Sequence, residues 1–366
     1  MRLFITLALV LLTTAPLRLE AQDTTPGTLQ GRVVDAKTGD PLASAHVFLA
    51  GSTLGTTTDR DGRYRLAHLP LGRHEIAASM LGYEHQSQRL LLSATDTASL
   101  DFRLKPTVIA LGEVFVAATQ PEQWRRRLET FEQLFLGTTH NAERCTLLNP
   151  EVLDFTDDDG HLRAEASAPL LIENLALGYR VHYYLKEFEV VHGVLRYLGI
   201  PRFDELEPRN KRERRRWERQ RRKTYEGSLQ HFLATLFATG NIKDVKKAGF
   251  EVSVAPQFER DPSSTFPVRS GSLLRPAAEP HSRLLAFEDH LQVVYTPDVR
   301  LPSPSGFPGI NSTSLDDYAS WITLTDGPAE IDRFGHLFDP YAVTTYGRWS
   351  QERIADILPR EYQPSR

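Results

Sequence analysis

The chain has 366 residues, of which 40% are hydrophobic and 25% charged, and its formal net charge is −4 at pH 7. This length allows two hydrophobic cores, and so small a negative charge gives no whole-chain field that would attract nucleic acid. Its one cysteine, Cys145, cannot form an internal disulfide and lies among apolar residues, so we expect a buried and unreactive thiol.

The first 22 residues predict a cleaved secretory signal peptide. Arg2 precedes an apolar run from Leu3 to Leu12, and the small residue Ala21 follows soon after. This run is too short for a stable membrane span, and no other segment reaches the roughly 18 apolar residues that a transmembrane helix needs. We therefore expect an exported protein of the periplasm, outer membrane or cell surface, without a transmembrane helix in the mature chain.

Residues 27–106 predict an all-β domain of seven strands. Short strand-like runs recur about every 8 to 12 residues and are separated by Gly, Asp and Pro, which is typical of a sandwich or barrel. The expected strands are 29–35, 44–50, 55–59, 63–69, 74–80, 85–93 and 98–104. In the second of them, Ala45, Val47 and Leu49 alternate toward the predicted core.

Two turns of this domain have side chains that predict how they close. Asp35 precedes Lys37–Asp40, where a side-chain-to-backbone hydrogen bond and a positive φ at Gly39 would form a turn. Asp59 and Asp61 are the possible start of a calcium loop, but the further ligands of an EF-hand are missing. We therefore expect their carboxylates to cap backbone N–H groups.

The order of these signals is that of one widespread module. The matching positions are Gly31, Val33, Asp35, Pro41, Leu42, Ala45, Val47, Thr58, Asp59, Asp61, Gly62, Tyr64, Leu71, Gly72, Gly82 and Tyr83. Together they resemble the carboxypeptidase regulatory-like domain over roughly residues 28–105. The resemblance implies a transthyretin-like β-sandwich that accompanies very different partner domains and has no active site of its own.

Residues 107–122 predict a final strand and linker. Leu111, Glu113, Val114 and Val116 resemble the segment that follows the same sandwich in TonB-dependent outer-membrane receptors. Such a receptor would also need a plug and a large β-barrel, and the rest of the chain is not a series of roughly ten-residue alternating strands. A full receptor is therefore not expected.

Residues 123–366 predict a mixed, β-rich α+β domain. Trp124, Leu128, Phe131 and Phe135 form one apolar stripe of a helix over 123–136, which Gly137 ends. Asp157–Gly160 predicts a hairpin tip. Strand-like runs follow at 161–167, 170–191, 193–203, 249–256 and 290–297, then a turn region at 301–309, a hairpin over 320–340 and a closing helix over 350–358.

Residues 209–223 carry the strongest charge feature of the chain. Lys and Arg greatly outnumber the two acids, Glu213 and Glu218, and helical spacing continues to Phe237, so we expect one helix or two consecutive helices. A solvated helix face, a contact with anionic lipid head groups or surface polysaccharide, and nucleic-acid binding are the possible interpretations; export disfavours nucleic acid. The candidate anionic-surface residues are Arg212, Arg214, Arg215, Arg216, Arg219, Arg221 and Arg222.

The sequence gives no catalytic signature, so no catalytic, cofactor-binding or metal residue is assigned. His140 and Glu143 have the H-x-x-E spacing of a zinc carboxypeptidase, but with twelve His in the chain one such match is expected by chance. The segments 135–155, 168–185, 224–233 and 347–362 together resemble the second region of bacterial envelope proteins that carry the same sandwich, and this resemblance covers most of residues 120–362. We therefore expect a non-enzymatic envelope protein with a binding or assembly role, possible partners being envelope proteins; the alternative is a peptide or glycan hydrolase with its site after residue 122.

Overall fold

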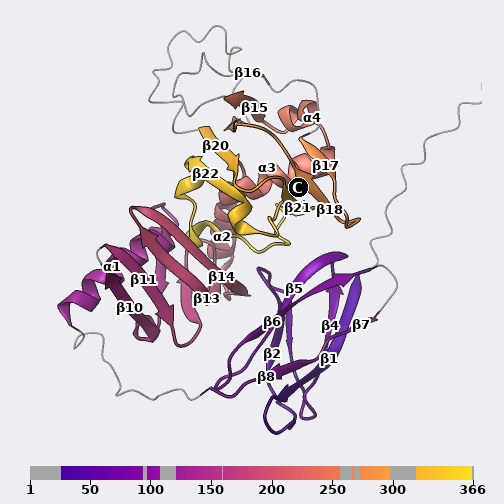
Figure 1. The fold of residues 1–366 in the computed structure, drawn as a ribbon, viewed down its shortest axis with the longest axis vertical. Helices are drawn as coiled ribbons and strands as arrows, with labels where there is room; N and C mark the ends of the chain where they lie inside the picture. The colour runs from indigo at the N-terminus through magenta and orange to yellow at the C-terminus, as the bar shows by residue number, and fades with distance from the viewer. Residues whose placement is uncertain are drawn as a thin grey trace, which may run out of the picture.

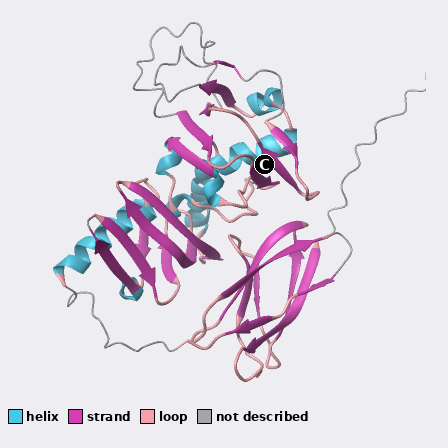
Figure 2. Ribbon diagram, in the orientation of Figure 1, coloured by secondary structure: helices cyan, strands magenta, loops and turns pink. Residues whose placement is uncertain are grey.

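The computed structural model describes residues 26–93, 97–107, 121–158, 160–255, 266–267, 273–296 and 319–364. The expected signal peptide, most of the expected linker and the 301–309 turn lie outside these residues. The described chain is mainly β with some α, which confirms the predicted fold class (Figure 2).

Residues 27–104 form a β-sandwich, as predicted (Figure 1). Its strands are β1 Gly27–Asp35, β2 His46–Leu49, β3 Gly55–Thr57, β4 Arg63–Leu69, β5 Gly72–Ser79, β6 Gln86–Leu92, β7 Thr97–Ser99 and β8 Phe102–Leu104. One sheet has the order β3-β2-β5-β6, and in the other β1 pairs with β4, β7 and β8. Ala45, Val47 and Leu49 are buried between the sheets, as their alternation predicted.

The two aspartate turns close as the sequence predicts. Asp35 Oδ1 accepts the backbone N–H groups of Lys37 and Thr38 at 2.6 and 3.0 Å, and Gly39 has φ +78°. Asp59 Oδ1 accepts the N–H groups of residues 61 and 63 at 2.9 and 2.8 Å. These carboxylates therefore satisfy backbone donors at the turns.

The expected last strand is divided into β7 and β8, which gives eight strands in place of seven. Both pair in parallel with β1, one after the other. Between them the chain approaches β1 so closely that a Cβ on Gly31 would lie 1.9 Å from the Leu100 carbonyl oxygen. The Asp101 carboxylate then accepts the Arg32 N–H at 2.7 Å, in the place of a backbone carbonyl. The backbone pairing along β1 is therefore interrupted between β7 and β8.

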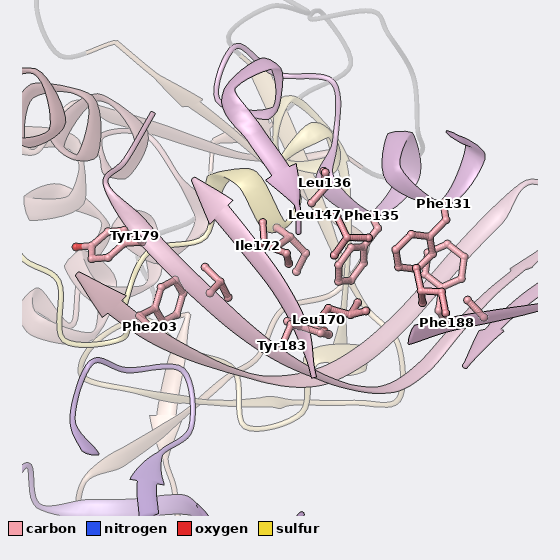
Figure 3. Close-up of a cluster of buried hydrophobic side chains, with 14 of the residues drawn as sticks. Phe131, Phe135, Leu136, Leu147, Leu170, Ile172, Tyr179, Tyr183, Phe188 and Phe203 are labelled. Carbon is pink, nitrogen blue, oxygen red and sulfur yellow. The ribbon is translucent and has the colours of Figure 1, made fainter. Parts of the chain in front are cut away.

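The middle part, residues 121–225, packs the predicted helix α1 Glu122–Leu136 against a six-stranded sheet. Its strands are β9 Cys145–Leu147, β10 Leu153–Asp158, β11 His161–Ala166, β12 Leu170–Asn174, β13 Tyr179–Val191 and β14 Val194–Glu205, and α2 Lys211–Tyr225 follows. Figure 3 shows Phe131 and Phe135 of α1 against Phe188 and Tyr183 of β13. The stripe predicted on α1 therefore faces this core.

A second core lies in residues 229–349, the helix–sheet part. Its elements are α3 Leu229–Thr239, α4 Ile242–Lys247, β15 Phe250–Ala255, β16 Phe266–Pro267, β17 Leu274–Pro276, β18 Ser282–Leu285, β19 His290–Tyr295, β20 Ala319–Leu324, β21 Ala329–Asp332 and β22 Val343–Gly347. The sheets have the orders β16-β15-β19-β20-β22 and β17-β18-β21. Phe232 and Leu236 of α3 pack with Phe250, Ile322 and Ile331 in this core.

Two sequence predictions for the last third of the chain are wrong. The expected 320–340 hairpin does not form, because β20 pairs with β19 and β22 whereas β21 pairs with β18 of the other sheet. The expected closing helix over 350–358 is replaced by 3-10 turns at Arg348–Gln351 and Ile354–Asp356. There the side chain of Asn174 donates to the Ala355 carbonyl at 2.9 Å and takes an acceptor that an α-helix would use.

The outer face of β2 and β5 lies against β13 and β14, so the sandwich is docked on the middle part. Phe48 is 1% exposed and stacks on Tyr184 with ring centroids 5.5 Å apart. The Gly51 N–H donates to the Pro201 carbonyl at 2.7 Å, and the Phe203 N–H donates to the Ser52 carbonyl at 3.0 Å. An apolar contact bordered by hydrogen bonds is the usual anatomy of a specific interface.

We predict that Phe48→Ala weakens this docking and leaves the sandwich folded, because Phe48 packs outside the sandwich core. Loss of a central aromatic contact should cost about 2 kcal/mol or more. Hydrogen exchange of the Gly51 and Phe203 amides should therefore quicken by more than about tenfold. The matched control is Leu91→Ala, on the edge strand of the same sheet and 44% exposed; equal effects of both changes would contradict the prediction.

Candidate functional site

Helix α2 holds the basic run, and its first turn is fixed by local hydrogen bonds. The Asn210 side chain caps the helix by accepting the Glu213 N–H at 3.0 Å. The Glu213 carboxylate accepts the Arg209 N–H at 2.8 Å and pairs with the Arg209 and Arg216 guanidinium groups. These donors lower the pKa of Glu213 to about 2. The chain forms two consecutive helices, α2 and α3, which is one of the two arrangements that the sequence predicted.

The inner side of α2 is anchored to the middle part. The Trp217 indole donates to the Leu175 carbonyl at 3.0 Å. Its ring packs so closely on Gly178 that a Cβ at that position would lie 2.3 Å from the nearest ring atom. Arg221 donates to the Leu177 and Gly178 carbonyls, pairs with Glu205 at 2.8 Å and covers the Tyr179 ring at 3.9 Å. Arg221 therefore has a structural role, although it belongs to the candidate anionic-surface set.

The outer side of α2 presents the other candidates to solvent. Arg212, Arg215 and Arg219 follow one another at i, i+3 and i+7, which places them on one exposed stripe. Arg214 and Arg222 are also exposed, and Arg216 is half-buried beside Glu213 at 3.3 Å. The structure thus brings five of the seven candidates, those other than Arg216 and Arg221, to the exposed surface of one helix.

A shallow hollow of about 370 Å³ lies where the second half of α2 meets the end of the described chain. Its lining residues are Glu218, Arg219, Arg221, Arg222, Lys223, Glu226, Tyr362 and Gln363. Cations outnumber acids in this lining, so the hollow continues the basic character of the helix surface.

Residues 350–364, the C-terminal tail, join all three parts of the molecule. The Arg360 guanidinium pairs with Asp332 at 2.5 Å, and both side chains are nine-tenths buried. The Arg360 N–H donates to the Gly51 carbonyl of the sandwich at 2.7 Å, and Glu361 accepts from the Thr53 hydroxyl at 2.5 Å. Tyr362 packs on Tyr225 at the end of α2. The Arg360–Asp332 ion pair was not expected from the sequence, in which the two residues are 28 positions apart.

The carboxyl groups of the tail are engaged in structural contacts. Asp356 accepts from the Thr139 hydroxyl at 2.9 Å and from the Asn141 amide at 2.8 Å, and burial raises its pKa. Burial also raises the pKa of Glu352, to about 8.

Cys145 donates to the Asn141 carbonyl at 3.3 Å, and burial raises the pKa of its thiol to about 12, so it is not a reactive thiolate at neutral pH.

The H-x-x-E motif forms no metal centre in the described residues. His140 and Glu143 are both exposed and contact each other at 3.1 Å. Across the described chain, no group of three or more His, Cys, Asp or Glu side chains is arranged to hold a metal ion.

None of the described helices is both long enough and apolar enough to cross a membrane.

Comparison with family models finds a match over the sandwich. Residues 29–116 match the family model described as CarboxypepD_reg-like domain, which covers the sandwich and agrees with the resemblance stated from sequence. No curated protein matches the chain.

Similar solved structures are matched over a small share of this chain. The 5-hydroxyisourate hydrolase of Klebsiella pneumoniae is 22% identical over 22% of this chain and 91% of its own, with a TM-score of 0.20. The pilus 2b backbone protein of group B streptococcus is 17% identical over 23% and 42% (TM-score 0.20), and catechol 1,2-dioxygenase of Pseudomonas arvilla C-1 is 17% identical over 28% and 60% (TM-score 0.19). The chain thus spans less than two thirds of the length of these last two proteins, and scores this low carry no functional argument.

We predict that Asp332→Asn strongly destabilises the protein. The asparagine keeps an oxygen for the N–H groups of Phe334 and His336 but leaves the buried Arg360 without a counter-charge. Such a loss costs about 3–5 kcal/mol, measured as the free energy of urea unfolding. The control Asp244→Asn removes an exposed partner of Lys247, which water screens, and should leave the free energy of unfolding nearly unchanged. Equal costs would contradict the role of the buried pair.

We also predict a pH dependence from Glu352. Its pKa rises from an ordinary 4.5 to about 8 in the fold, so the unfolded chain loses this proton first as pH increases. The contribution is fully present below pH 4.5 and is lost as pH rises through about 8. Glu352→Gln should therefore gain stability relative to the unchanged protein between these values. If Glu352→Gln gains no stability in this pH range, the raised pKa of Glu352 is refuted. The control is Glu122→Gln, at an exposed position.

Proposed function

We propose that this chain, in which residues 29–116 match the CarboxypepD_reg-like domain, is a non-catalytic protein of the cell envelope that contacts anionic lipid head groups through the outer face of α2. Export and cleavage near Gln22 are part of the proposal and rest on the N-terminal sequence. The observation that carries the proposal is a basic stripe on a helix whose other side is anchored to the protein.

The geometry of α2 supports a contact with a charged surface. Nine Lys and Arg side chains stand against two Glu between Lys211 and Lys223. Trp217 and Arg221 fix the helix from behind, so the exposed Arg212, Arg215 and Arg219 are presented without first having to order the backbone. Each basic residue near an anionic membrane surface contributes about 1 kcal/mol, and salt screens this attraction within about 10 Å.

The charge of this helix contrasts with that of the whole chain. With a net charge of −4, the protein as a whole is weakly repelled by an anionic surface. Binding through α2 would therefore orient the molecule, with the side that carries the α2 stripe toward the surface. An oriented peripheral contact fits a binding or assembly role, in which the docked sandwich is held at a fixed place relative to the surface.

The test compares the unchanged mature protein with the variant Arg212→Gln, Arg215→Gln and Arg219→Gln. We expect the unchanged protein to bind phosphatidylglycerol vesicles, to release them as salt increases, and to ignore phosphatidylcholine vesicles. The triple variant should bind at least about tenfold more weakly. The control variant Arg125→Gln, Arg126→Gln and Lys243→Gln removes the same charge from exposed positions elsewhere and should bind as the unchanged protein does.

Equal binding by the two triple variants would overturn the α2 contact. Export is tested separately by fractionating cells that produce the full chain and by sequencing the N-terminus of the recovered protein. Recovery of an uncleaved chain in the cytoplasm would overturn the envelope location.

A further inference from the structure

The second sheet of the sandwich carries a cluster of arginines on its outer face. Leu29 and Val33 of β1, Tyr64 and Leu66 of β4, and Phe102 and Leu104 of β8 are buried in the sandwich core. Because strand side chains alternate, the residues between them point outward. Four of these outward positions are arginines, all exposed: Arg32, Arg63, Arg65 and Arg103. We call this set the arginine face.

The register brings these cations close together. Arg32 lies directly opposite Arg63 in the antiparallel pair of β1 and β4, and Arg65 lies opposite Gln30. Arg103 of β8 lies opposite Val34, two residues along β1 from Arg32. Like charges directly opposite one another destabilise a sheet, so the Arg32–Arg63 pair works against the stability of the fold.

Two of the acids beside the arginine face accept backbone N–H groups. Asp101 accepts the Arg32 N–H at 2.7 Å, and Asp59 accepts the Arg63 N–H at 2.8 Å. The Arg32 side chain donates its Nε–H to the carbonyl of residue 61 at 2.8 Å. In the part of the chain that the structure describes, the four guanidinium groups form no ion pair with a carboxylate. The face therefore has four guanidinium groups beside the three carboxylates of Asp59, Asp61 and Asp101, and its net charge is positive by about one unit.

The arginine face belongs to the sheet that the rest of the described chain leaves uncovered. The other sheet is docked through Phe48 onto β13 and β14, and Figure 1 shows β1 and β4 on the side of the sandwich turned away from them. The cluster extends about 10 Å across three strands and about 14 Å along them. The large exposed apolar side chains of the described chain, such as Leu81 and Val194, lie on other elements, so the surface of this face is polar.

We propose that the arginine face binds an acidic polysaccharide through the carboxylates of successive sugar units. A guanidinium group receives a carboxylate through two parallel hydrogen bonds, and the rows of the sheet place such groups roughly 5 to 7 Å apart. A flexible anionic polymer can bring several carboxylates to so small a cluster. This surface and its partner are separate from the α2 contact, and different variants test them.

The test uses polygalacturonate as the probe, with neutral dextran as the uncharged control. The unchanged protein should bind polygalacturonate with an affinity that falls as salt increases, and should not bind dextran. Arg32→Gln with Arg63→Gln should weaken this binding about tenfold. Arg125→Gln with Arg126→Gln removes the same charge from α1 and should leave it unchanged. The α2 triple variant should also keep polygalacturonate binding.

Thermal unfolding distinguishes a ligand surface from a structural one. Since the two arginines repel each other, the Arg32→Gln and Arg63→Gln variant should unfold at the same or a higher temperature than the unchanged protein. Weaker binding together with a lower unfolding temperature would overturn the proposal, as would equal binding by the α1 control. If the double variant loses vesicle binding and the unchanged protein ignores polygalacturonate, the partner is a lipid surface and the proposal fails.

Discussion

The arrangement of the molecule depends on the buried ion pair between Arg360 and Asp332. Its two charges are held in a site that water scarcely reaches, so each requires the other. The backbone and side chain of Arg360 also bond to the carbonyls of Gly51 and Arg73 in the sandwich. One residue near the end of the chain thereby fixes the sandwich, the helix–sheet part and the tail relative to one another. A change at this point would affect three packed parts at once.

Docking gives the two sheets of the sandwich different roles. One sheet uses its outer face to pack Phe48 and Ala77 on Tyr184 and Ile200, and Lys186 reaches Glu75 at the border of this contact. Among the described residues, the arginines on the outer face of the other sheet are exposed. The sandwich is therefore part of the main body of the protein, held by apolar contact and by backbone hydrogen bonds. The docking on β13 and β14 thus fixes the direction in which the other sheet of the described sandwich faces a partner.

Local patterns predicted the parts of the structure that local forces govern. Period-two alternation located most strands of the sandwich, and the stripe around Phe131 located α1, because burial on one side of a regular element determines both. Asp35 and Asp59 closed their turns as expected, because each bonds to a backbone group only a few residues away. The prediction of a 320–340 hairpin was wrong because the choice of partner strand depends on segments elsewhere in the chain.

By itself the sequence determined the sandwich, the first helix, the basic run and the absence of a recognisable catalytic motif. Tertiary structure alone decided that Phe48 is buried outside the sandwich core, that Arg221 anchors α2, and that Arg32 faces Arg63. The physical reason is range. Turn chemistry and alternation act between residues close in the chain, whereas burial of an outer sheet face and the pairing of Arg360 with Asp332 arise only when distant segments pack together.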